Sequence, residues 1–235
     1  MKKLILLLTL TVLLFANNTG SSQSFPFLGN NFKNLNFECA GFVTAIYPVG
    51  NPANLANQIL YAKTDVGGVY KSTNNGLNWI SISSYVNDPG SGENLSFSEY
   101  LNAGLAVNPK DSNNVVVAWG SFEEDAYKKD YNCLWMSSDG GNTWNKSNFQ
   151  NCTGPWFEGD NFMRKVGGEC ITFDPIAPNT VYVGGNSYSS SEKPKLYKSE
   201  DGGKNFSVVN SFVSDLINEQ ILCISIHKTT GRMWI

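Results

Sequence analysis

The sequence predicts an all-β protein, a β-propeller of four-stranded blades, from three observations. Glycine is frequent, with 22 residues among 235, and helical periodicity is scarce. Short apolar runs follow one another along the chain and are bounded by turn residues, as antiparallel strands are. A hairpin-like segment also recurs from Ser72, Ser137 and Ser199, starts that lie 65 and 62 residues apart. Four-stranded units repeated at such a period are typical of propeller blades.

The recurring segments read STNNGLNW, SSDGGNTW and SEDGGKNF, and each lies between two short apolar runs. Asn or Asp followed by Gly suits a tight turn, because the side chain caps its own backbone and glycine accepts a positive φ. The segments resemble the Asp-box, S-x-D-x-G-x-T-W, of sialidase-like and sortilin-like propellers. The aromatic residue at each end should pack against a neighbouring sheet. The predicted structural residues of these boxes are Asn74, Gly76, Trp79, Asp139, Gly141, Trp144, Asp201, Gly203 and Phe206.

Each unit is predicted to hold four strands, A to D, with the box in the turn between C and D. In the first unit the strands are expected at 42–47, 58–63, 69–72 and 79–83. A fourth unit stops inside its second strand, and three blades with part of a fourth cannot close a ring. We therefore expect an incomplete, N-terminal part of a propeller over 23–235, with the missing blades or a second propeller as partner. The predicted blades are about 37–83, 103–147 and 169–209, with a fourth from about 221.

The first residues read as a secretory signal peptide over 1–22. Two lysines precede an apolar run from Leu4 to Phe15, and small polar residues follow. The sequence thus predicts a secreted, extracellular protein with no membrane partner. The mature part holds five cysteines, an odd number whose pairing the sequence leaves open. Four Asn-x-Ser/Thr sequons are either glycan acceptors in a eukaryotic host or chance in an Asn-rich chain: Asn94, Asn145, Asn151 and Asn205.

Composition excludes several kinds of protein. Charged residues make up 16% of the chain, the net charge is −3, and no basic stripe is present to hold nucleic acid. His227 is the only histidine, so a His-containing catalytic triad or a His-rich metal site cannot be built. The DGG turns lack the regular oxygen ligands of calcium loops and are better interpreted as structural turns. We therefore expect no cofactor and no metal.

Loop lengths indicate which side of the propeller binds ligand. In a four-stranded blade, A–B and C–D turns share one side, while B–C links and crossovers share the other. The long segments, about 84–102, 121–132, 148–168 and 185–195, all belong to the second side. Binding residues concentrate on loops held by a rigid scaffold. That side is therefore the predicted working side.

The first B–C link, TDVGG, is short by contrast and carries Asp65. A short link keeps this carboxylate near the blade, and the longer neighbouring loops would wall the space above it into a cleft. The two glycines let other atoms approach the backbone closely. The alternative is that Asp65 only closes a turn. Aromatic rings on the surrounding loops are candidates to stack on sugars, although each can equally pack its own loop: Tyr100, Phe122, Trp156 and Tyr188.

Two stretches resemble glycoside hydrolase family 74, the xyloglucan-cleaving endoglucanases and reducing-end-specific cellobiohydrolases. They are GFVTAIYP with LYAKTDVGGVYKS, and VGGECITFDPIAPNTVYVGG, and the resemblance runs from about Phe42 to the end. It implies two tandem seven-bladed propellers with a glucan-binding cleft between them and inverting hydrolysis of β-1,4-glucan. The Asp of the family's T-D-[IV]-G-G motif is the catalytic base, which assigns that role to Asp65. The chain departs from the family at Cys170, where an Arg is usual, and in the Asn-Asn-Gly of its first box.

The resemblance also implies that the catalytic acid comes from the second propeller, and nothing in this chain corresponds to it. Acidic residues do lie on the predicted working side, but their spacing singles out none of them: Glu93, Glu99, Glu123, Glu124, Asp125, Glu158 and Asp160. Two functions therefore stay open. The first is a secreted glycoside hydrolase acting on xyloglucan, of which this chain alone is inactive. The second is a non-catalytic propeller that binds carbohydrate or protein, as sortilin-like ectodomains do.

Overall fold

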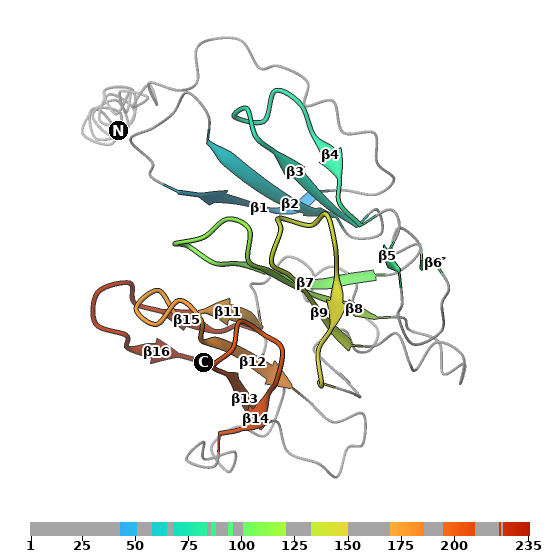
Figure 1. Cartoon of the computed structure of the whole chain (residues 1–235). Helices are drawn as coiled ribbons and strands as arrows, with labels where there is room; N and C mark the ends of the chain where they lie inside the picture. The colour runs from blue at the N-terminus through green and yellow to red at the C-terminus, as the bar shows by residue number, and fades with distance from the viewer. Residues whose placement is uncertain are drawn as a thin grey trace, which may run out of the picture. The chain divides into compact units, whose positions relative to one another are not determined.

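The structure is a computed structural model, and all the residues that it describes belong to the compact unit Leu35–Ile235. Every regular element in this part of the chain is a β-strand, as Figure 1 shows. The described part therefore contains no helix able to cross a membrane. The described residues are 43–50, 58–64, 68–83, 86–87, 94–95, 101–120, 133–149, 170–185, 195–209, 221 and 223–235.

Three four-stranded antiparallel sheets form the fold, and we call them the first, second and third blade. The strand orders are β1-β2-β3-β4, β7-β8-β9-β10 and β11-β12-β13-β14, so each strand pairs with the next along the chain. The predicted all-β propeller of four-stranded blades is confirmed. A two-stranded sheet of β15 and β16, which we call the fourth unit, ends the chain.

In the first blade the bounds lie within two residues of the predicted strands. The first blade comprises β1 (Val43–Val49), β2 (Ile59–Thr64), β3 (Val69–Ser72) and β4 (Ile80–Ser81). The second comprises β7 (Leu101–Val107), β8 (Val115–Gly120), β9 (Cys133–Ser137) and β10 (Asn145–Lys146). The third comprises β11 (Ile171–Phe173), β12 (Val181–Gly185), β13 (Lys195–Ser199) and β14 (Ser207–Val208). The fourth unit comprises β15 (Ser225–Ile226) and β16 (Met233–Trp234).

One crossover differs from the expected loop. Between the first and second blades, β5 (Val86–Asn87) pairs with β6 (Asn94–Leu95), and β7 already begins at Leu101. The ladder of β7 and β8 has an irregularity between Asn102 and Gly104, where the register shifts. A bulge of this kind lets a strand continue although one residue lacks a partner. The alternation of apolar and polar residues in the sequence does not reveal this irregularity, because the extra residue reverses the alternation.

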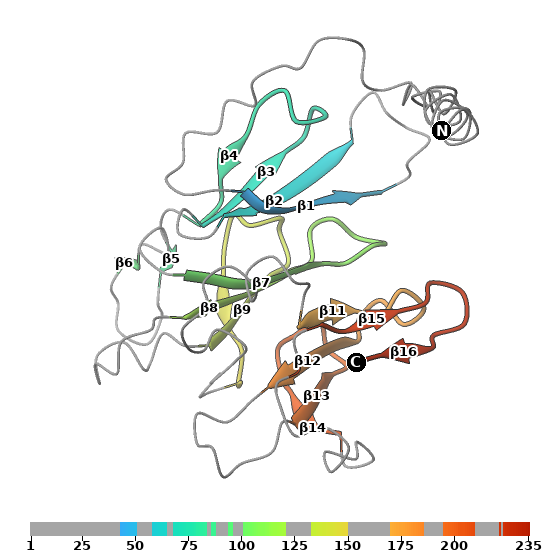
Figure 2. The same cartoon turned by 180° about the vertical axis from the view of Figure 1, so that it is seen from behind.

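The second blade lies between the other two, as Figures 1 and 2 both show. Strand β8 is buried on both faces, so all four residues from Val115 to Ala118 have no exposed surface. A sheet covered on both sides needs a continuous apolar strand and not an alternating one. Trp135 of the next strand is also fully buried. In β1 of the first blade, by contrast, Val43 and Ile46 are 37% and 44% exposed.

The C–D turns share one hydrogen-bonded design. In the second blade, the Ser137 hydroxyl accepts the N–H of Gly141 at 2.8 Å and donates to Asp139 Oδ1 at 2.8 Å. Gly140 and Gly141 have φ values of +73° and +93°, a region in which other residues are strained. The Ser72 and Ser199 hydroxyls make the equivalent bonds in the other turns. The serine thus fixes both the capping carboxyl or amide and the box glycine.

The capping side chain then holds the far end of the turn. Asp139 accepts the backbone N–H of Thr143 at 2.9 Å and its hydroxyl at 2.6 Å. In the third blade, Asp201 accepts the backbone N–H of Asn205 at 2.9 Å and its side-chain amide at 2.7 Å. Asn74 in the first blade accepts the N–H of residue 78 at 2.9 Å. Asparagine therefore replaces the aspartate as a backbone cap without its charge.

The Asp139 carboxyl makes the turn sensitive to pH. Burial raises its pKa, but hydrogen bonds from Thr143, Ser137 and Asn142 outweigh burial and hold the pKa below its ordinary value of 3.8. A depressed pKa stabilises the fold above about pH 4, and this contribution is lost as the pH falls through the lowered value. We expect Asp139→Asn to lower the free energy of unfolding by about 1 kcal/mol at pH 7. The difference should shrink toward zero near pH 2.

Urea denaturation of Asp139→Asn and of the wild-type chain at both pH values measures this effect. Asp201→Asn is the matched second case, because the pKa of Asp201 is also held below its ordinary value by hydrogen bonds that outweigh burial. If Asp139→Asn loses the same free energy of unfolding at pH 7 and at pH 2, the charge of the carboxylate is not involved.

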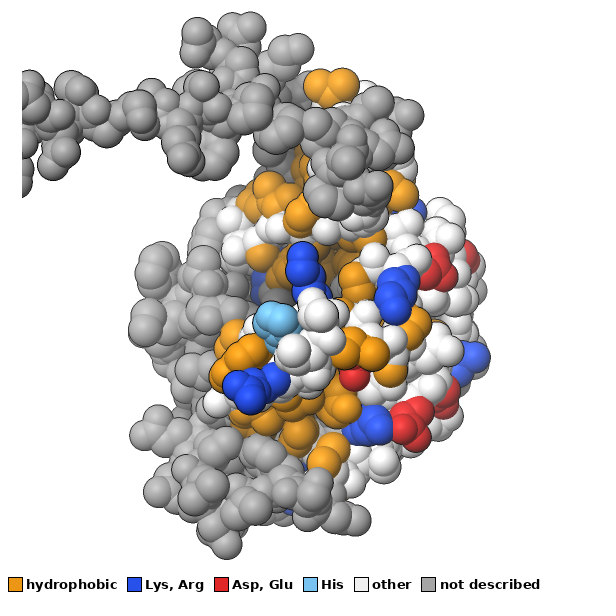
Figure 3. Space-filling view, turned by 90° about the vertical axis from the view of Figure 1, so that its left-hand side faces the viewer, with side chains coloured by type: hydrophobic (Ala, Val, Ile, Leu, Met, Phe, Trp, Pro, Cys, Tyr) orange, Lys and Arg blue, Asp and Glu red, His pale blue; other side chains and the backbone are white. Residues whose placement is uncertain are grey.

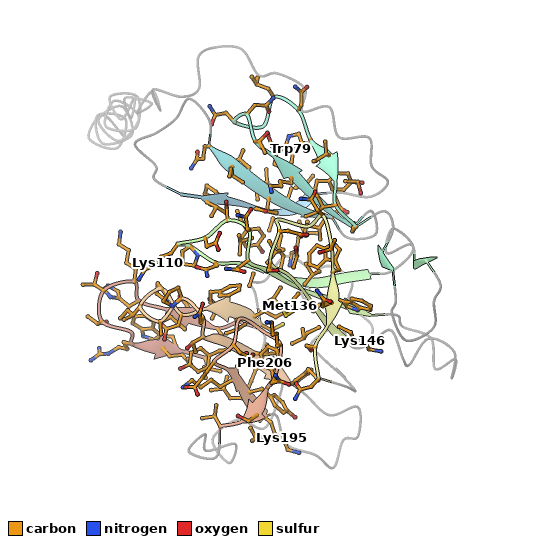
Figure 4. The ribbon with its side chains drawn as sticks, in the orientation of Figure 1. Trp79, Lys110, Met136, Lys146, Lys195 and Phe206 are labelled. Atoms are coloured by element: carbon orange, nitrogen blue, oxygen red, sulfur yellow. The ribbon has the colours of Figure 1, made fainter. Side chains whose placement is uncertain are left out.

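Aromatic residues at the ends of the boxes join neighbouring blades. The Trp144 indole N–H donates to the carbonyl of Ile82 in the first blade at 2.8 Å. Phe206 of the third blade meets Phe149 of the second edge to face, with ring centroids 5.5 Å apart. Trp79, labelled with Phe206 in Figure 4, donates to the carbonyl of Gly76 in its own turn at 3.0 Å. The second and third boxes therefore reach the preceding blade.

A polar cluster also joins the first blade to the turns of the second. The Tyr61 hydroxyl donates to the carbonyl of Ser112 at 2.7 Å, and Lys71 Nζ donates to the carbonyl of Gly140 at 3.2 Å. The Lys71 ammonium lies 5.5 Å from the centre of the Tyr61 ring. Burial, followed by the charges of Asp111 and Asp139, raises the pKa of Tyr61. Burial lowers the pKa of Lys71, while Asp139 opposes that shift.

The two classes of turn lie on one side of each blade. The N–H of Asn75 donates to the carbonyl of Gln58 at 3.2 Å, which ties the C–D turn of the first blade to the start of β2. Gly140 and Gly202 make the same bond in the second and third blades, to Asn113 at 2.9 Å and Asn179 at 2.8 Å. The A–B and C–D turns therefore share one side of the blade, as predicted. The B–C links leave the opposite ends of the strands.

Candidate functional site

The candidate site is the link between β2 and β3 that carries the predicted base. Asp65 lies outside the described residues, together with the other two residues of the link, 66 and 67. The structure describes the residues on either side, Thr64 and Gly68. They determine how the link is held.

Two hydrogen bonds close the link at its base. The backbone N–H of Thr64 donates to the carbonyl of Gly68 at 3.0 Å, and the Thr64 hydroxyl donates to the same carbonyl at 3.1 Å. Gly68 has a φ of +90°, a conformation that favours glycine. Only three residues therefore connect two fixed points. The short link predicted around Asp65 rests on a closed support.

The strand that follows the link is fixed in the same way. The Val69 N–H donates to the Ser83 hydroxyl at 2.8 Å, and the Val69 carbonyl accepts the N–H of Ile82 at 3.0 Å. Thr64, Val69 and Ser83 have no exposed surface. Side chains carried by rigid, buried elements are held more precisely than those on long loops. The support below Asp65 therefore belongs to the core of the first blade.

Lys63 is a feature of this support that the sequence reasoning missed. Its side chain is fully buried, although lysine is almost never buried without a compensating group. In β2 it is two residues from Tyr61, so both side chains point to the face that meets the second blade. Alternation along β2 places Lys63 on the same face as Tyr61, but nothing within the strand indicates that the lysine is buried. A lysine side chain is thus buried two residues before the predicted base.

The link leaves the blade at the end opposite to the box hairpin. The box of the first blade is bonded to Gln58, at the start of β2, whereas the link follows Thr64, at its end. The topology therefore places the acid-bearing link away from the Asp-box turns. This is the arrangement that the predicted working side requires.

The structure does not describe the other predicted site residues. The candidate ring residues all lie outside the described residues, and so do the loop acids among which the sequence made no choice: Tyr100, Phe122, Trp156, Tyr188, Glu93, Glu99, Glu123, Glu124, Asp125, Glu158 and Asp160. Within the described ranges, no three His, Cys, Asp or Glu side chains come together in a way that would hold a metal ion.

Comparisons with known proteins give a consistent result. No protein-family model matches the chain. A xyloglucanase of Hypocrea jecorina (strain QM6a) is 30% identical over 156 residues, which cover 66% of this chain and 17% of that protein. A xyloglucanase of a Paenibacillus species is 29% identical over 190 residues, which cover 74% of this chain and 17% of that protein. The chain thus spans less than a fifth of the length of these relatives.

A solved structure shows the same fold. The crystal structure of the GH74 xyloglucanase from Xanthomonas campestris matches 85% of this chain and 27% of that chain, with a TM-score of 0.56 and 18% identity. At this identity the match concerns the fold alone, and it agrees with the described blades. Together with the two curated relatives, it confirms the resemblance of this chain to the xyloglucanases of glycoside hydrolase family 74.

Proposed function

We propose that this chain is the base-bearing part of a secreted glycoside hydrolase that cleaves xyloglucan, a β-1,4-glucan, with inversion of configuration. Asp65 is the general base in this proposal. The curated relatives named as xyloglucanases support the substrate class. The apolar N-terminal run supports secretion into the extracellular space.

The observation that carries the proposal is the closed support of the Asp65 link. Thr64 and Gly68 are bonded directly to each other, and the residues beneath them are buried. A turn that served only to connect β2 and β3 would not need a carboxylate at the end opposite to the hairpins. This placement suits a group that meets a substrate.

Inverting hydrolysis defines what the carboxylate does. A base removes a proton from a water molecule, the water attacks the anomeric carbon, and an acid donates a proton to the leaving oxygen. The two carboxyl groups stand roughly 6.5–9.5 Å apart, so that the water fits between base and sugar. Aspartate side chains ordinarily titrate near pH 3.9, so an aspartate base is ionised at neutral pH and can accept the proton. In this proposal the acid is supplied by a part of the enzyme outside this chain.

The proposal is tested with the purified chain and with a fusion. Affinity electrophoresis in gels containing xyloglucan should retard the chain, while hydrolysis by the chain alone should be negligible. Fusion to the part of the Paenibacillus relative that follows its matched residues should restore hydrolysis. Asp65→Asn in the fusion should then lower turnover by at least about 100-fold with little change in retardation, because the base acts on water.

Two controls accompany this test. Glu200→Gln removes an exposed acid of the third box and should leave turnover unchanged. The complete Paenibacillus relative shows that the assay detects cleavage. Turnover that survives Asp65→Asn would refute the assignment of the base. Normal migration of the chain in xyloglucan gels would contradict the proposed substrate.

A further inference from the structure

Three A–B turns of the protein are built alike, and the third contains the only histidine. We name them the second-blade turn (108–114), the third-blade turn (174–180) and the fourth-unit turn (227–232). In each turn the N–H of the first residue donates to the carbonyl of the last. These bonds are Asn108 to Asn114 at 2.9 Å, Asp174 to Thr180 at 2.8 Å and His227 to Arg232 at 2.9 Å.

The first side chain of each turn also accepts backbone N–H groups from inside the turn. Asn108 Oδ1 accepts the N–H of Lys110 at 2.9 Å. Asp174 Oδ1 accepts the N–H groups of Ile176 at 2.8 Å and Ala177 at 3.2 Å. This is the usual way in which Asn and Asp stabilise turns. Two of the three turns therefore begin with a conventional cap.

His227 takes the same role with a ring nitrogen. Its Nδ1 accepts the N–H of Thr229 at 3.4 Å and the N–H of Thr230 at 3.2 Å. These are the residues two and three positions further on, the same offsets that Asp174 uses. Nδ1 can accept only in the neutral ring that carries its proton on Nε2. Both backbone bonds therefore form only with the neutral Nε2–H tautomer of His227.

The fourth-unit turn also touches the third blade. A Cβ added at Gly231 would lie 3.2 Å from Ile176 Cδ1, so the two turns are in contact. The His227 ring meets Trp234 edge to face, with centroids 6.2 Å apart. Behind the turn, Ile224 belongs to one buried cluster with Leu196 of the third blade, and Ile226 of β15 and Met233 of β16 pack against that cluster. The turn and the residues of its hairpin therefore both lie against the third blade.

The turns at His227 carry charged side chains of both signs. Its own turn contributes Lys228 and Arg232, and the third-blade turn contributes Asp174. From the second blade, Lys110 Nζ reaches the carbonyl of Ile176 at 3.3 Å. Figure 3 shows the histidine, in pale blue, at the surface with blue side chains, the colour of lysine or arginine, near it. All three residues of the fourth-unit turn named here, His227, Lys228 and Arg232, are exposed, so protons reach the ring freely.

We propose that His227 makes the fourth-unit turn, and with it the docking of the β15–β16 hairpin on the third blade, dependent on pH. Histidine changes charge between about pH 5 and 8. Protonation puts an N–H at Nδ1, so the ring presents a donor to the N–H groups of Thr229 and Thr230. The Thr230 hydroxyl, 3.0 Å away, can still accept from the ring, but the two backbone groups lose their acceptor. The turn is therefore capped above this range and uncapped below it.

NMR of the full chain tests this proposal, because a single histidine gives one set of ring signals. The ring nitrogens should report the Nε2–H tautomer at pH 8. Amide exchange protection at Thr230 should fall by about 10-fold between pH 8 and pH 5, after correction for intrinsic exchange. The Overhauser contact between Gly231 and the Ile176 methyl should weaken over the same range. Ile176 and Lys110, capped by Asp174 and Asn108, are internal controls whose protection should stay constant.

The matched variant is His227→Asn, which copies the cap of the second-blade turn. It should keep the Thr230 protection and the contact between Gly231 and Ile176 at both pH values. His227→Asp, which copies the third-blade turn, should do the same above pH 5. The proposal is overturned if the wild-type ring carries its proton on Nδ1 at pH 8. It is also overturned if Thr230 protection follows that of Ile176 throughout the titration. The wild-type measurement decides the matter even if the variants fail to fold.

Discussion

Replacing Trp144 with alanine is expected to lower the free energy of unfolding by about 4 kcal/mol, within the range for large-to-small changes of buried aromatic residues. The side chain is only 6% exposed and packs in the core shared by the three blades. Its removal leaves a cavity and takes the indole donor away from the carbonyl of Ile82. The loss falls on the contact between the first and second blades.

Two variants separate the parts of this effect. Trp144→Phe keeps most of the volume and loses the hydrogen bond, and it should cost about 1 kcal/mol. Trp79→Ala changes the same box position in the first blade, where the side chain is partly exposed and bonded within its own turn, and it should cost less than half as much as Trp144→Ala. Urea denaturation followed by far-UV circular dichroism measures all three. Equal losses at the two tryptophans would mean that Trp144 does not join the blades.

Gly141→Ala is expected to be comparably severe, at about 3 kcal/mol. The residue has a φ of +93°, and the left-handed conformation costs other residues about 1–2 kcal/mol. An added Cβ would also lie 2.6 Å from Ile82 Cδ1 and 2.8 Å from Ile82 Cβ. The second atom is attached to the backbone and cannot turn away. Overpacking of this kind typically costs a further 1–3 kcal/mol.

The chain offers one control variant for the backbone strain and one for the overpacking. Gly202, in the third box, has a φ of +76° and open space around an added Cβ, so Gly202→Ala measures the backbone strain alone. Gly184 is not in the left-handed region, but an added Cβ would lie 2.2 Å from Ile221 Cγ2, so Gly184→Ala measures the contact alone. Gly141→Ala should cost more than Gly202→Ala, because it adds the contact with Ile82 to the backbone strain. A loss at Gly141 no larger than that at Gly202 would show that Ile82 moves aside at no cost.

The box turns could be predicted because their chemistry is local. In each box the serine and the capping residue are two positions apart, as in Ser72 and Asn74 or Ser137 and Asp139. The hydrogen bonds that they make stay within five residues of the chain. Local pattern also predicted the strands of the first blade to within two residues, with β3 at 69–72 as expected. The two left-handed positions in each turn followed from Gly, with Asn75 as the exception at a φ of +59°. Asparagine tolerates that conformation better than most residues.

The candidate site could be predicted only in part. The short link and its position opposite the hairpins followed from strand order. The bonds between Thr64 and Gly68, which make the link a closed structure, and the full burial of Lys63 did not. Burial depends on what the neighbouring blade places over a strand, and the Tyr61–Ser112 bond joins residues 51 positions apart. No pattern within β2 contains that information.

The same distinction holds for the whole molecule. Turn residues, strand periodicity and the repeat were enough to establish an all-β chain of four-stranded blades and to place Asp65 in a short link, because each depends on neighbours within a few residues. Packing between blades decided that Trp144 reaches Ile82, that Gly141 has no room for a side chain and that the turn of His227 lies against Ile176. These contacts join residues about 55 to 65 positions apart. Their partners are selected by the shape and burial of complete sheets, which exist only once the chain has folded.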